Sequence, residues 1–546
     1  MSFKQRLANW AGVPSGTPGN PETAPPTLYW GMRDLPISDA TQRFLVVGGP
    51  GSGKSTVLGF LMQSVLPYII EPGFDHRALI YDAKRDTLPA LAAMGFRTEA
   101  TPEGPAEVRT LNPFDKRGFA WNLCRDIDSP AAALQLSTIL IAPEEHSSQP
   151  FFTDSARLLL HGVLLALLHK RKQHSKESQG FKWSLRDVIL IMQDVNRLRS
   201  VLLSCRHSKD RVALLLDEPK VAANIMSTVA TKLLPFEIVA ALWHHAEKEG
   251  RILSLNDWVN GKFILVLGSH PANRAAIQPI NQGIFRRIAD LLLTQPDVPH
   301  PKNKDEPSHG IHARKTWLFL DEVREAGKLD GLSSILNQGR SKGVCTVLGF
   351  QDIEGMRRVY GNEEAHEIIG QCDNKTVLRT ESYPTAKWAE EHFGQALFLE
   401  YTASVSHTQA EHNSQSQSEQ QTLRQAPIVL ASKFMSIPRT GLKNPRTGYH
   451  NPLSGWHDIP SVGAYGYELS WPEVQSRRRQ GIPGRPPIYD VLGEDPRSPD
   501  DQYLEFWDDD EIKQLGVSAA PPASATAVDQ QDVQATLDAV TRHQLP

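Results

Sequence analysis

The sequence predicts an α/β fold built on a mostly parallel sheet, with an all-α segment inserted into it. Short apolar runs recur along the chain and end in glycine or acidic residues, which is typical of buried parallel strands. One run, 44–47, leads into a glycine-rich loop and then into a segment with helical spacing. Between 131 and 255 glycine is scarce and apolar residues recur at helical intervals, which indicates the inserted helices.

The order of these patterns divides the chain into segments. We expect a Pro-rich leader at 1–27, an α/β domain formed by 28–130 and 256–445, and an all-α insertion domain at 131–255. A C-terminal extension at 446–517 and a disordered tail at 518–546 follow. The Ser/Gln-rich stretch 401–421 predicts a hairpin. Further strands are predicted at 78–81, 263–267, 317–320, 344–348 and 376–378.

Composition and charge exclude several classes of protein. The 546 residues are 40% hydrophobic and 22% charged, which argues against a disordered or fibrous chain. The formal net charge of -4 gives no overall basic field, so any contact with DNA must be local. The four cysteines are far apart and lack CxxC spacing, which predicts neither a disulfide framework nor a zinc site.

The apolar stretches predict a cytoplasmic protein. The most apolar one, 158–168, is too short to cross a bilayer, which needs about 20 residues. The N-terminus is polar and Pro-rich where a signal peptide would be apolar.

The glycine-rich loop after the strand at 44–47 fits the pattern GxxxxGK[ST] in full, at 48–55. Its glycines let backbone N–H groups curl around phosphate oxygens, and the following helix adds partial positive charge. Lys54 would reach the β- and γ-phosphates, and Ser55 would offer a hydroxyl to Mg²⁺. The predicted nucleotide-binding residues are Gly48, Gly49, Pro50, Gly51, Ser52, Gly53, Lys54, Ser55 and Thr56.

A phosphate site of this kind also needs a carboxylate at the end of a neighbouring strand. Two stretches compete for this role, 317–322 and 213–218, and both end in Asp-Glu. The first has aromatic, strand-favouring residues, whereas the second lies in the helical zone before Pro219 and indicates a helix end. We therefore predict that Asp321 holds the metal ion and that Glu322 orients water.

Three shorter signals are less specific. Asp82, Lys84 and Asp86 follow the strand at 78–81 and are equally compatible with a strand-end cluster and a solvated loop. The basic run at 477–479 is more typical of a solvated face than of a phosphate contact. The acidic segment 508–511, beside two aromatic residues, fits either a partner-binding peptide or a disordered one.

Ordered motifs from about residue 30 to 441 resemble those of the conjugative coupling proteins of type IV secretion systems, relatives of the FtsK and HerA DNA-pumping ATPases. The motifs are RFL at 43–45, LIYD at 79–82, LNPFD at 111–115, WN at 121–122, FF at 151–152, AR at 156–157, LNDW at 255–258, FLDE at 319–322, NQGR at 337–340, GFQ at 349–351, YG at 360–361 and VLAS at 429–432.

The resemblance implies a RecA-like domain with an all-α insertion, arranged as a hexameric ring that hydrolyses ATP with Mg²⁺ and handles DNA, single-stranded or bound to a relaxase. It also implies that Gln351 senses the γ-phosphate and that Arg340 reaches across the subunit interface as an arginine finger. A guanidinium suits that role because it stabilises charge on the transferring phosphoryl group.

The N-terminus departs from the family pattern. Conjugative members usually carry N-terminal transmembrane helices, and here only the Pro-rich leader precedes the predicted domain. We expect a separate membrane component of the secretion system to serve as partner, with no direct membrane insertion. A HerA- or FtsK-type DNA-processing pump and a nucleotide-dependent, non-enzymatic adaptor for protein cargo are the alternative functions.

Overall fold

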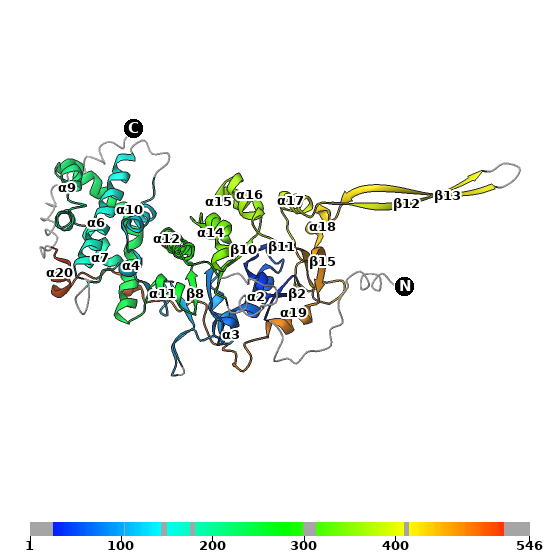
Figure 1. Cartoon of the computed structure of the whole chain (residues 1–546), viewed down its shortest axis with the longest axis horizontal. Coiled ribbons are helices and arrows are strands. Elements are labelled where there is room, and N and C mark those ends of the chain that lie inside the picture. The colour runs from blue at the N-terminus through cyan, green and yellow to red at the C-terminus, as the bar shows by residue number, and fades with distance from the viewer. Residues whose placement is uncertain are drawn as a thin grey trace, which may run out of the picture.

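A computed structural model describes residues 26–102, 104–143, 150–174, 181–298, 313–408 and 414–517. Figure 1 shows an elongated molecule, with a sheet at its centre, a group of helices at one end and a long hairpin at the other. The expected leader and tail lie outside the described residues, except for Pro26 and Thr27.

The central sheet has nine strands in the order β15-β14-β11-β3-β10-β9-β4-β8-β5. The strands from β11 to β5 run parallel, whereas β14 and β15 are antiparallel to their neighbours. The predicted fold class, a mostly parallel α/β sheet with inserted helices, is confirmed. In chain order the strands are β3 (Phe44–Val47), β4 (His76–Asp82), β5 (Val108–Thr110), β8 (Ile264–Gly268), β9 (Lys315–Leu320), β10 (Val344–Phe350), β11 (Asn374–Val377), β14 (Leu453–Ile459) and β15 (Gly463–Leu469).

The inner strands are buried on both faces, which explains their nearly continuous apolar sequences. Every residue of β3, β9 and β10 is buried. Successive side chains of a strand point to opposite faces. In β9, Trp317 and Phe319 therefore join one apolar core, and Leu318 and Leu320 join the other.

Helices cover both faces of the sheet. The face of Trp317 is covered by α2 (Lys54–Val65), α3 (Thr87–Ala93), η3 (Leu66–Ile69), α19 (Trp471–Arg478) and the β1–β2 hairpin (Thr27–Trp30 and Arg33–Pro36), with η2 (Ile37–Thr41) leading into β3. The face of Leu318 is covered by α11 (Leu255–Asn260), α12 (Arg274–Leu293), α14 (Leu332–Gln338), α15 (Ile353–Tyr360) and α16 (Asn362–Gly370). Short 3-10 turns are η4 (Pro271–Asn273), η5 (Val323–Ala326) and η6 (Gly339–Lys342).

Most of the described residues of the inserted segment are helical, and turns and short loops join the helices. A short parallel pair, β6 (Ala120–Trp121) and β7 (Ile252–Leu253), joins its entry to its exit. The stretch 213–218 ends a helix and precedes the Pro219 that starts the next one, as predicted. The helices are α4 (Leu123–Asp126), α5 (Pro130–Leu140), α6 (Pro150–Gln173), α7 (Leu185–Met192), α8 (Val195–Leu203), α9 (Asp210–Leu215) and α10 (Pro219–Lys248).

Two of these helices, α6 and α10, are long and apolar enough to cross a membrane by length and composition. The continuous apolar stretch 158–168 is part of the longer helix α6, whose ends add further apolar residues among polar ones. Within their most apolar windows, 61% and 44% of the residues are buried inside the protein. Much of this apolar surface is therefore used in packing against neighbouring helices.

The predicted hairpin is longer than the stretch 401–421. Its strands β12 (Gln395–Thr408) and β13 (Ser414–Pro427) pair in antiparallel register over their whole length. It projects away from the sheet, from a base formed by α17 (Tyr383–Phe393) and α18 (Ala431–Ser436) (Figure 1).

The chain beyond residue 445 is part of the fold. The sheet continues past this expected boundary, because β14 pairs with β11. Residues 480–517, which we call the C-terminal strap, then run from α3 to the inserted helices. Ile482 N donates to Met94 O at 2.8 Å near the start of the strap, and Trp507 Nε1 donates to Asp187 Oδ1 at 2.6 Å near its end. The strap contains η7 (Pro499–Gln502) and α20 (Asp509–Leu515), so the acidic segment 508–511 is helical and packed on the protein.

Candidate nucleotide-binding and catalytic site

The glycine-rich loop joins β3 to α2 and depends on backbone conformations that favour glycine. Gly51 and Gly53 have positive φ angles of 72° and 97°. A Cβ on Gly53 would lie 2.3 Å from Leu453 Cδ1, so this position also lacks room for a side chain. The sequence pattern therefore reflects a real geometric need, which is a tight curl of backbone ahead of the α2 N-terminus.

Neighbouring segments hold this loop from outside. Gly49 N donates to Arg379 O at 2.8 Å. Thr440 donates from its backbone N–H to Gly51 O and from its hydroxyl to Ser52 O, so it bonds the carbonyls of the loop and leaves the N–H groups at the start of α2 to other partners. The first turn of a helix leaves N–H groups without intrahelical acceptors. Ser52 Oγ is buried and has no hydrogen-bond partner among the described residues. The loop thus presents unsatisfied donors, which is the chemistry that phosphate oxygens satisfy.

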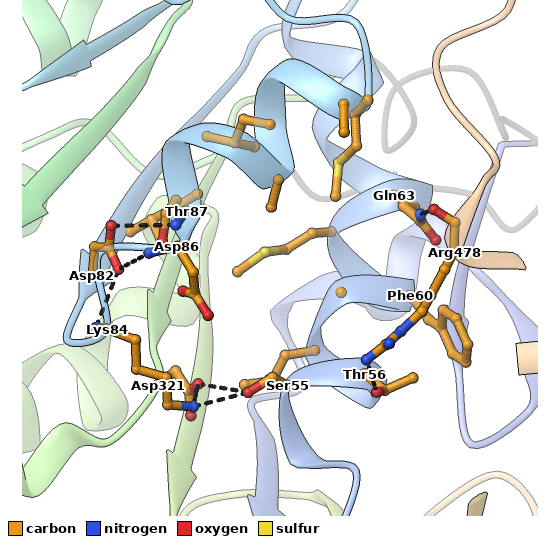
Figure 2. A pocket seen from close by; sticks show the side chains of 18 of the residues that line it. Ser55, Thr56, Phe60, Gln63, Asp82, Lys84, Asp86, Thr87, Asp321 and Arg478 are labelled. Carbon is orange, nitrogen blue, oxygen red and sulfur yellow. Dashed lines mark hydrogen bonds and ion pairs between the residues drawn. The ribbon is translucent and has the colours of Figure 1, made fainter. Parts of the chain in front are cut away.

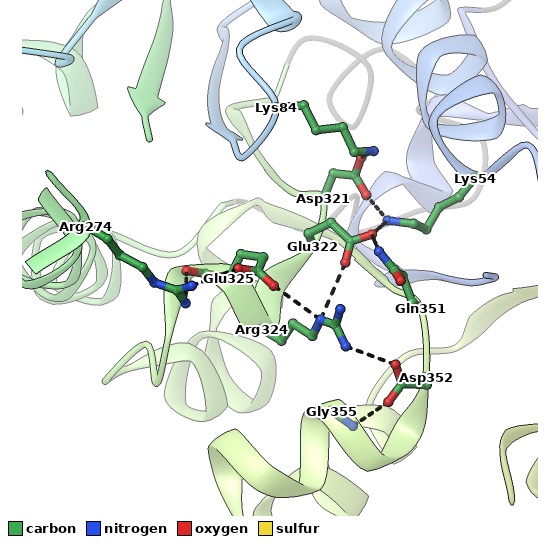
Figure 3. A network of polar contacts seen from close by, with 10 residues as sticks. All are labelled: Lys54, Lys84, Arg274, Asp321, Glu322, Arg324, Glu325, Gln351, Asp352 and Gly355. Carbon is green, nitrogen blue, oxygen red and sulfur yellow. Dashed lines mark hydrogen bonds and ion pairs between the residues drawn. The ribbon is translucent and has the colours of Figure 1, made fainter. Parts of the chain in front are cut away.

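Lys54 lies between two carboxylates at the end of β9 (Figure 3). Its ammonium group donates to both Asp321 Oδ1 and Glu322 Oε1, and the Lys54 side chain is only 6% exposed. Gln351, at the end of β10, donates from Nε2 to Glu322 Oε1 at 3.1 Å. The structure therefore brings together four of the predicted site residues, from three different strand ends.

Lys84 belongs to the same cluster (Figure 2). Its Nζ donates to Ser55 Oγ at 2.9 Å and to Asp321 Oδ2 at 3.2 Å, while Ser55 Oγ lies 3.4 Å from Asp321 Oδ2. Asp82 shapes the turn, since it accepts hydrogen bonds from the backbone N–H groups of Lys84 and Thr87. Of the two interpretations of this segment, the structure supports the strand-end cluster.

The electrostatics of this cluster keep Asp321 ionised. Burial alone would raise the pKa of Asp321, but the ammonium groups of Lys54 and Lys84 outweigh burial and lower the pKa below its usual range. Burial conversely raises the pKa of Asp82, with the nearby Asp86 adding to the rise. Asp321 is therefore a carboxylate at neutral pH and is available to a metal ion.

Glu322 has an unusual backbone and an unused oxygen. Its φ of 56° places it in the left-handed region, which non-glycine residues rarely adopt and which clusters at functional sites. Its Oε2 is buried and has no hydrogen-bond partner among the described residues, although Arg324 Nε lies 3.9 Å away. One oxygen of Glu322 thus holds Lys54, and the other faces the guanidinium of Arg324 without a hydrogen bond.

Arg340 lies away from this cluster. It is exposed on η6, just before β10 begins, whereas Gln351 follows the end of β10. The seven residues of β10, at about 3.3 Å each, separate the two positions by roughly 23 Å. Arg340 is instead close to Asp39. Burial raises the pKa of the Asp39 carboxyl, while the hydrogen bond from Ser38 and the charge of Arg340 oppose this rise. It does not approach the glycine-rich loop of its own chain.

A cavity of about 490 Å³ above the glycine-rich loop reveals residues that the sequence did not single out. Thr440, Trp471 and Arg478 line it together with the loop, Lys84, Glu322 and Gln351. Arg478 donates to Thr56 Oγ1 at 2.6 Å, so this member of the basic run 477–479 borders the site. The run was visible in the sequence, but only its packing beside α2 shows which arginine faces the loop.

The model of one protein family matches residues 30–446, and its description is the DNA-binding domain of the type IV secretion-system coupling protein. The chain belongs to this family. The predicted resemblance is therefore confirmed. The comparison with curated proteins gave no match.

Solved structures give the same fold. The bacterial conjugative coupling protein TrwBdeltaN70, in an unbound form, is 18% identical, with a TM-score of 0.54, and the match covers 82% of this chain and 89% of that one. The plasmid coupling protein TrwB, solved with ADP and Mg²⁺, is 17% identical at the same TM-score and coverage. It has also been solved with a non-hydrolysable ATP analogue, at 17% identity, a TM-score of 0.54 and the same coverage. These likenesses confirm the RecA-like fold with an all-α insertion.

Proposed function

We propose that this protein is an ATP-driven DNA translocase, which acts as the coupling ATPase of conjugative transfer or type IV secretion. The observation that carries the proposal is the position of Lys54. It follows a glycine-rich loop in which Gly51 and Gly53 have positive φ angles, and Asp321 and Glu322 hold its ammonium group. The family description names a DNA-binding domain, and the similar protein TrwB has been solved with ADP and Mg²⁺.

The donors and acceptors present fit MgATP. Unsatisfied N–H groups at the start of α2 and the buried Ser52 hydroxyl suit phosphate oxygens. Ser55 and Asp321 would hold Mg²⁺, which neutralises charge on the phosphates. No group of three or more His, Cys, Asp or Glu side chains fit for a metal occurs among the described residues. A metal ion held by Ser55 and Asp321 would therefore share its shell with the nucleotide.

Each residue of the cluster has a distinct task in the proposed reaction. Lys54 exchanges its two carboxylate partners for phosphate oxygens, and Lys84 releases Ser55 and Asp321 at the same moment. Glu322, relieved of Lys54, orients and deprotonates the attacking water through its buried carboxylate. Gln351 contacts Glu322 and is placed to report the γ-phosphate to β10.

We place Arg340 in the site of a neighbouring subunit. It cannot reach its own glycine-rich loop, since roughly 23 Å of β10 lies between them and an extended arginine side chain spans roughly 7 Å. An arginine supplied in trans stabilises the transition state and couples hydrolysis to assembly. We propose that the subunits form a hexameric ring on DNA and ATP. Such a ring would supply this contact at every interface.

The proposed site of action is the cytoplasmic side of the membrane, where secretion-system components would serve as membrane partners and DNA, single-stranded or relaxase-bound, as substrate.

ATP hydrolysis with and without DNA tests the proposal. Lys54→Ala and Glu322→Gln should abolish turnover while leaving the thermal unfolding midpoint near that of the wild type. Glu218→Gln is the matched control, because it changes the glutamate of the competing Asp-Glu pair, which lies at the end of α9 and outside the cavity. Wild-type turnover in both site variants would overturn the assignment. ATP binding without any turnover, with or without DNA, would replace it with the adaptor function.

A further inference from the structure

Part of the wall of the cavity above the glycine-rich loop comes from the end of the chain. The residues concerned, Trp471 and Arg478, are the first and last residues of α19. Both lie beyond residue 446, where the match to the family ends. Whatever they recognise is thus a property of this chain's own C-terminal segment.

The direction of α2 gives the cavity two chemically different sides. Residues two apart on a helix are rotated by about 200°, so Lys54 and Thr56 leave α2 on opposite sides. Lys54 points to the carboxylates, and Thr56 is bonded to Arg478. Because the lysine of this motif reaches the β- and γ-phosphates, the rest of a nucleotide extends toward Arg478.

Trp471 lines the cavity on that side. Its ring is partly exposed and packs against Gly441, where a Cβ would lie only 2.6 Å from Trp471 Cη2. His450 stacks on it, with ring centroids 6.0 Å apart and an angle of 26° between the planes. A capping box formed by Ser470 and Glu473 fixes the start of α19. The indole is therefore held in place before any ligand binds.

Arg478 adds a cation to the same side. Its Cζ lies 5.8 Å from the Trp471 ring centroid, and its guanidinium reaches the Thr56 hydroxyl. Arg477, by contrast, stacks over Tyr29 at 3.8 Å and is directed to the β1–β2 hairpin. Only one of the two neighbouring arginines is thus placed at the cavity.

We propose that Trp471 and Arg478 form the nucleoside subsite, in which Trp471 stacks on the base and Arg478 binds the α-phosphate beside Thr56. The inference rests on the proposed ATP site. It concerns the base and the α-phosphate, whereas Lys54 of the glycine-rich loop would bind the β- and γ-phosphates. Stacking on an indole accepts any base, since every base has a π-face. The subsite therefore takes nucleoside triphosphates with little discrimination between bases, ATP and GTP included.

Binding of ATP and of inorganic tripolyphosphate, measured by calorimetry on the full chain, tests the subsite. Trp471→Ala should weaken ATP binding about 10-fold and leave tripolyphosphate binding unchanged. Trp471→Phe keeps a stacking ring and should bind ATP within about 3-fold of the wild type. Normal tripolyphosphate binding by Trp471→Ala also shows that the variant retains a folded phosphate site.

Arg477→Ala provides the contrasting result. Arg477 is the neighbour of Arg478 on α19, but it stacks over Tyr29 and does not line the cavity. This variant should leave ATP affinity unchanged. Unaltered ATP affinity in Trp471→Ala, or a loss in Arg477→Ala alone, would overturn the subsite while leaving the phosphate site in place. Failure of the wild type to bind either ligand would instead refute the proposed function.

Discussion

Mixed rings of Lys54→Ala and Arg340→Ala subunits should recover ATP hydrolysis that neither variant has alone. The first variant lacks a working phosphate site but keeps its arginine, and the second has the opposite defect. Arg340 lies roughly 23 Å along β10 from the Gln351 end of its own chain, so its proposed role requires the site of a neighbouring subunit. Loss of such an arginine should lower the turnover rate about 10³- to 10⁵-fold.

The recovery has a definite size. In a ring of equal, randomly mixed subunits, about one interface in four pairs an intact phosphate site with an intact arginine. The mixture should therefore reach about a quarter of wild-type turnover if interfaces work independently. Turnover is measured with DNA, and native mass measurement shows that both variants share a ring.

A mixture of Lys54→Ala with Glu322→Gln provides the matched control. Both changes disable the same side of an interface, so no pairing of these subunits gives a complete site, and the mixture should stay inactive. Equal inactivity of the Lys54→Ala and Arg340→Ala mixture, in rings shown to be mixed, would refute the trans role. Wild-type turnover by Arg340→Ala alone would refute it as well.

Three further changes test other parts of the structure. Trp507→Ala should lower the free energy of unfolding by about 3–5 kcal/mol. Trp507→Phe should lower it by about 1–3 kcal/mol, because this variant loses mainly the bond to the Asp187 carboxylate. Urea unfolding measures both changes, and an unchanged free energy of unfolding in both variants would show that the strap is not docked. Burial lowers the pKa of His76 and of His457 to about 3, so each histidine takes up a proton more readily in the unfolded state. The free energy of unfolding should therefore fall as the pH drops below about 6.5, by about 2 kcal/mol per histidine at pH 5. The rings of Tyr68 and Phe74 flank His76, so His76→Phe should fit this site and weaken the pH dependence. The urea unfolding midpoint is measured against pH, and the same dependence in this variant and the wild type would contradict the prediction. Gly53→Ala should abolish ATP binding in calorimetry, since it needs a φ of 97° and meets Leu453; retained affinity would show that the loop relaxes.

The parts of the site that the sequence predicted are those set by local geometry. The glycine-rich loop needs its glycines at fixed positions, so its pattern survives in the sequence whatever surrounds it. Asp321 and Glu322 follow an apolar strand, and carboxyl ends of parallel strands meet at one edge of a sheet. Gln351 was predicted from the family resemblance alone, and it meets the cluster because β10 ends at the same edge. The roles assigned to these residues stay predictions until the variants are measured.

The parts that the sequence did not predict depend on packing between distant segments. Lys84 lies two residues from Asp82 and from Asp86 along the chain, but its partners Ser55 and Asp321 are brought close only by the order of β3, β4 and β9. Arg478 belongs to a run of three arginines, and the docking of α19 beside α2 decides which one faces the cavity. The strands β14 and β15 contain glycine and polar residues with weak alternation, which gave no sign that they extend the central sheet.

The late position of β14 and α19 in the chain affects how the protein can be made on the ribosome. The glycine-rich loop emerges early, but Leu453, which packs against Gly53, and Trp471, which lines the cavity, are translated roughly 400 residues later. At 5–20 residues per second this interval lasts about 20–80 s. A nascent chain stalled before β14 would carry the complete phosphate-binding motif and still lack the walls of its site. Polypeptides released early should therefore lack a complete form of the proposed ATP site.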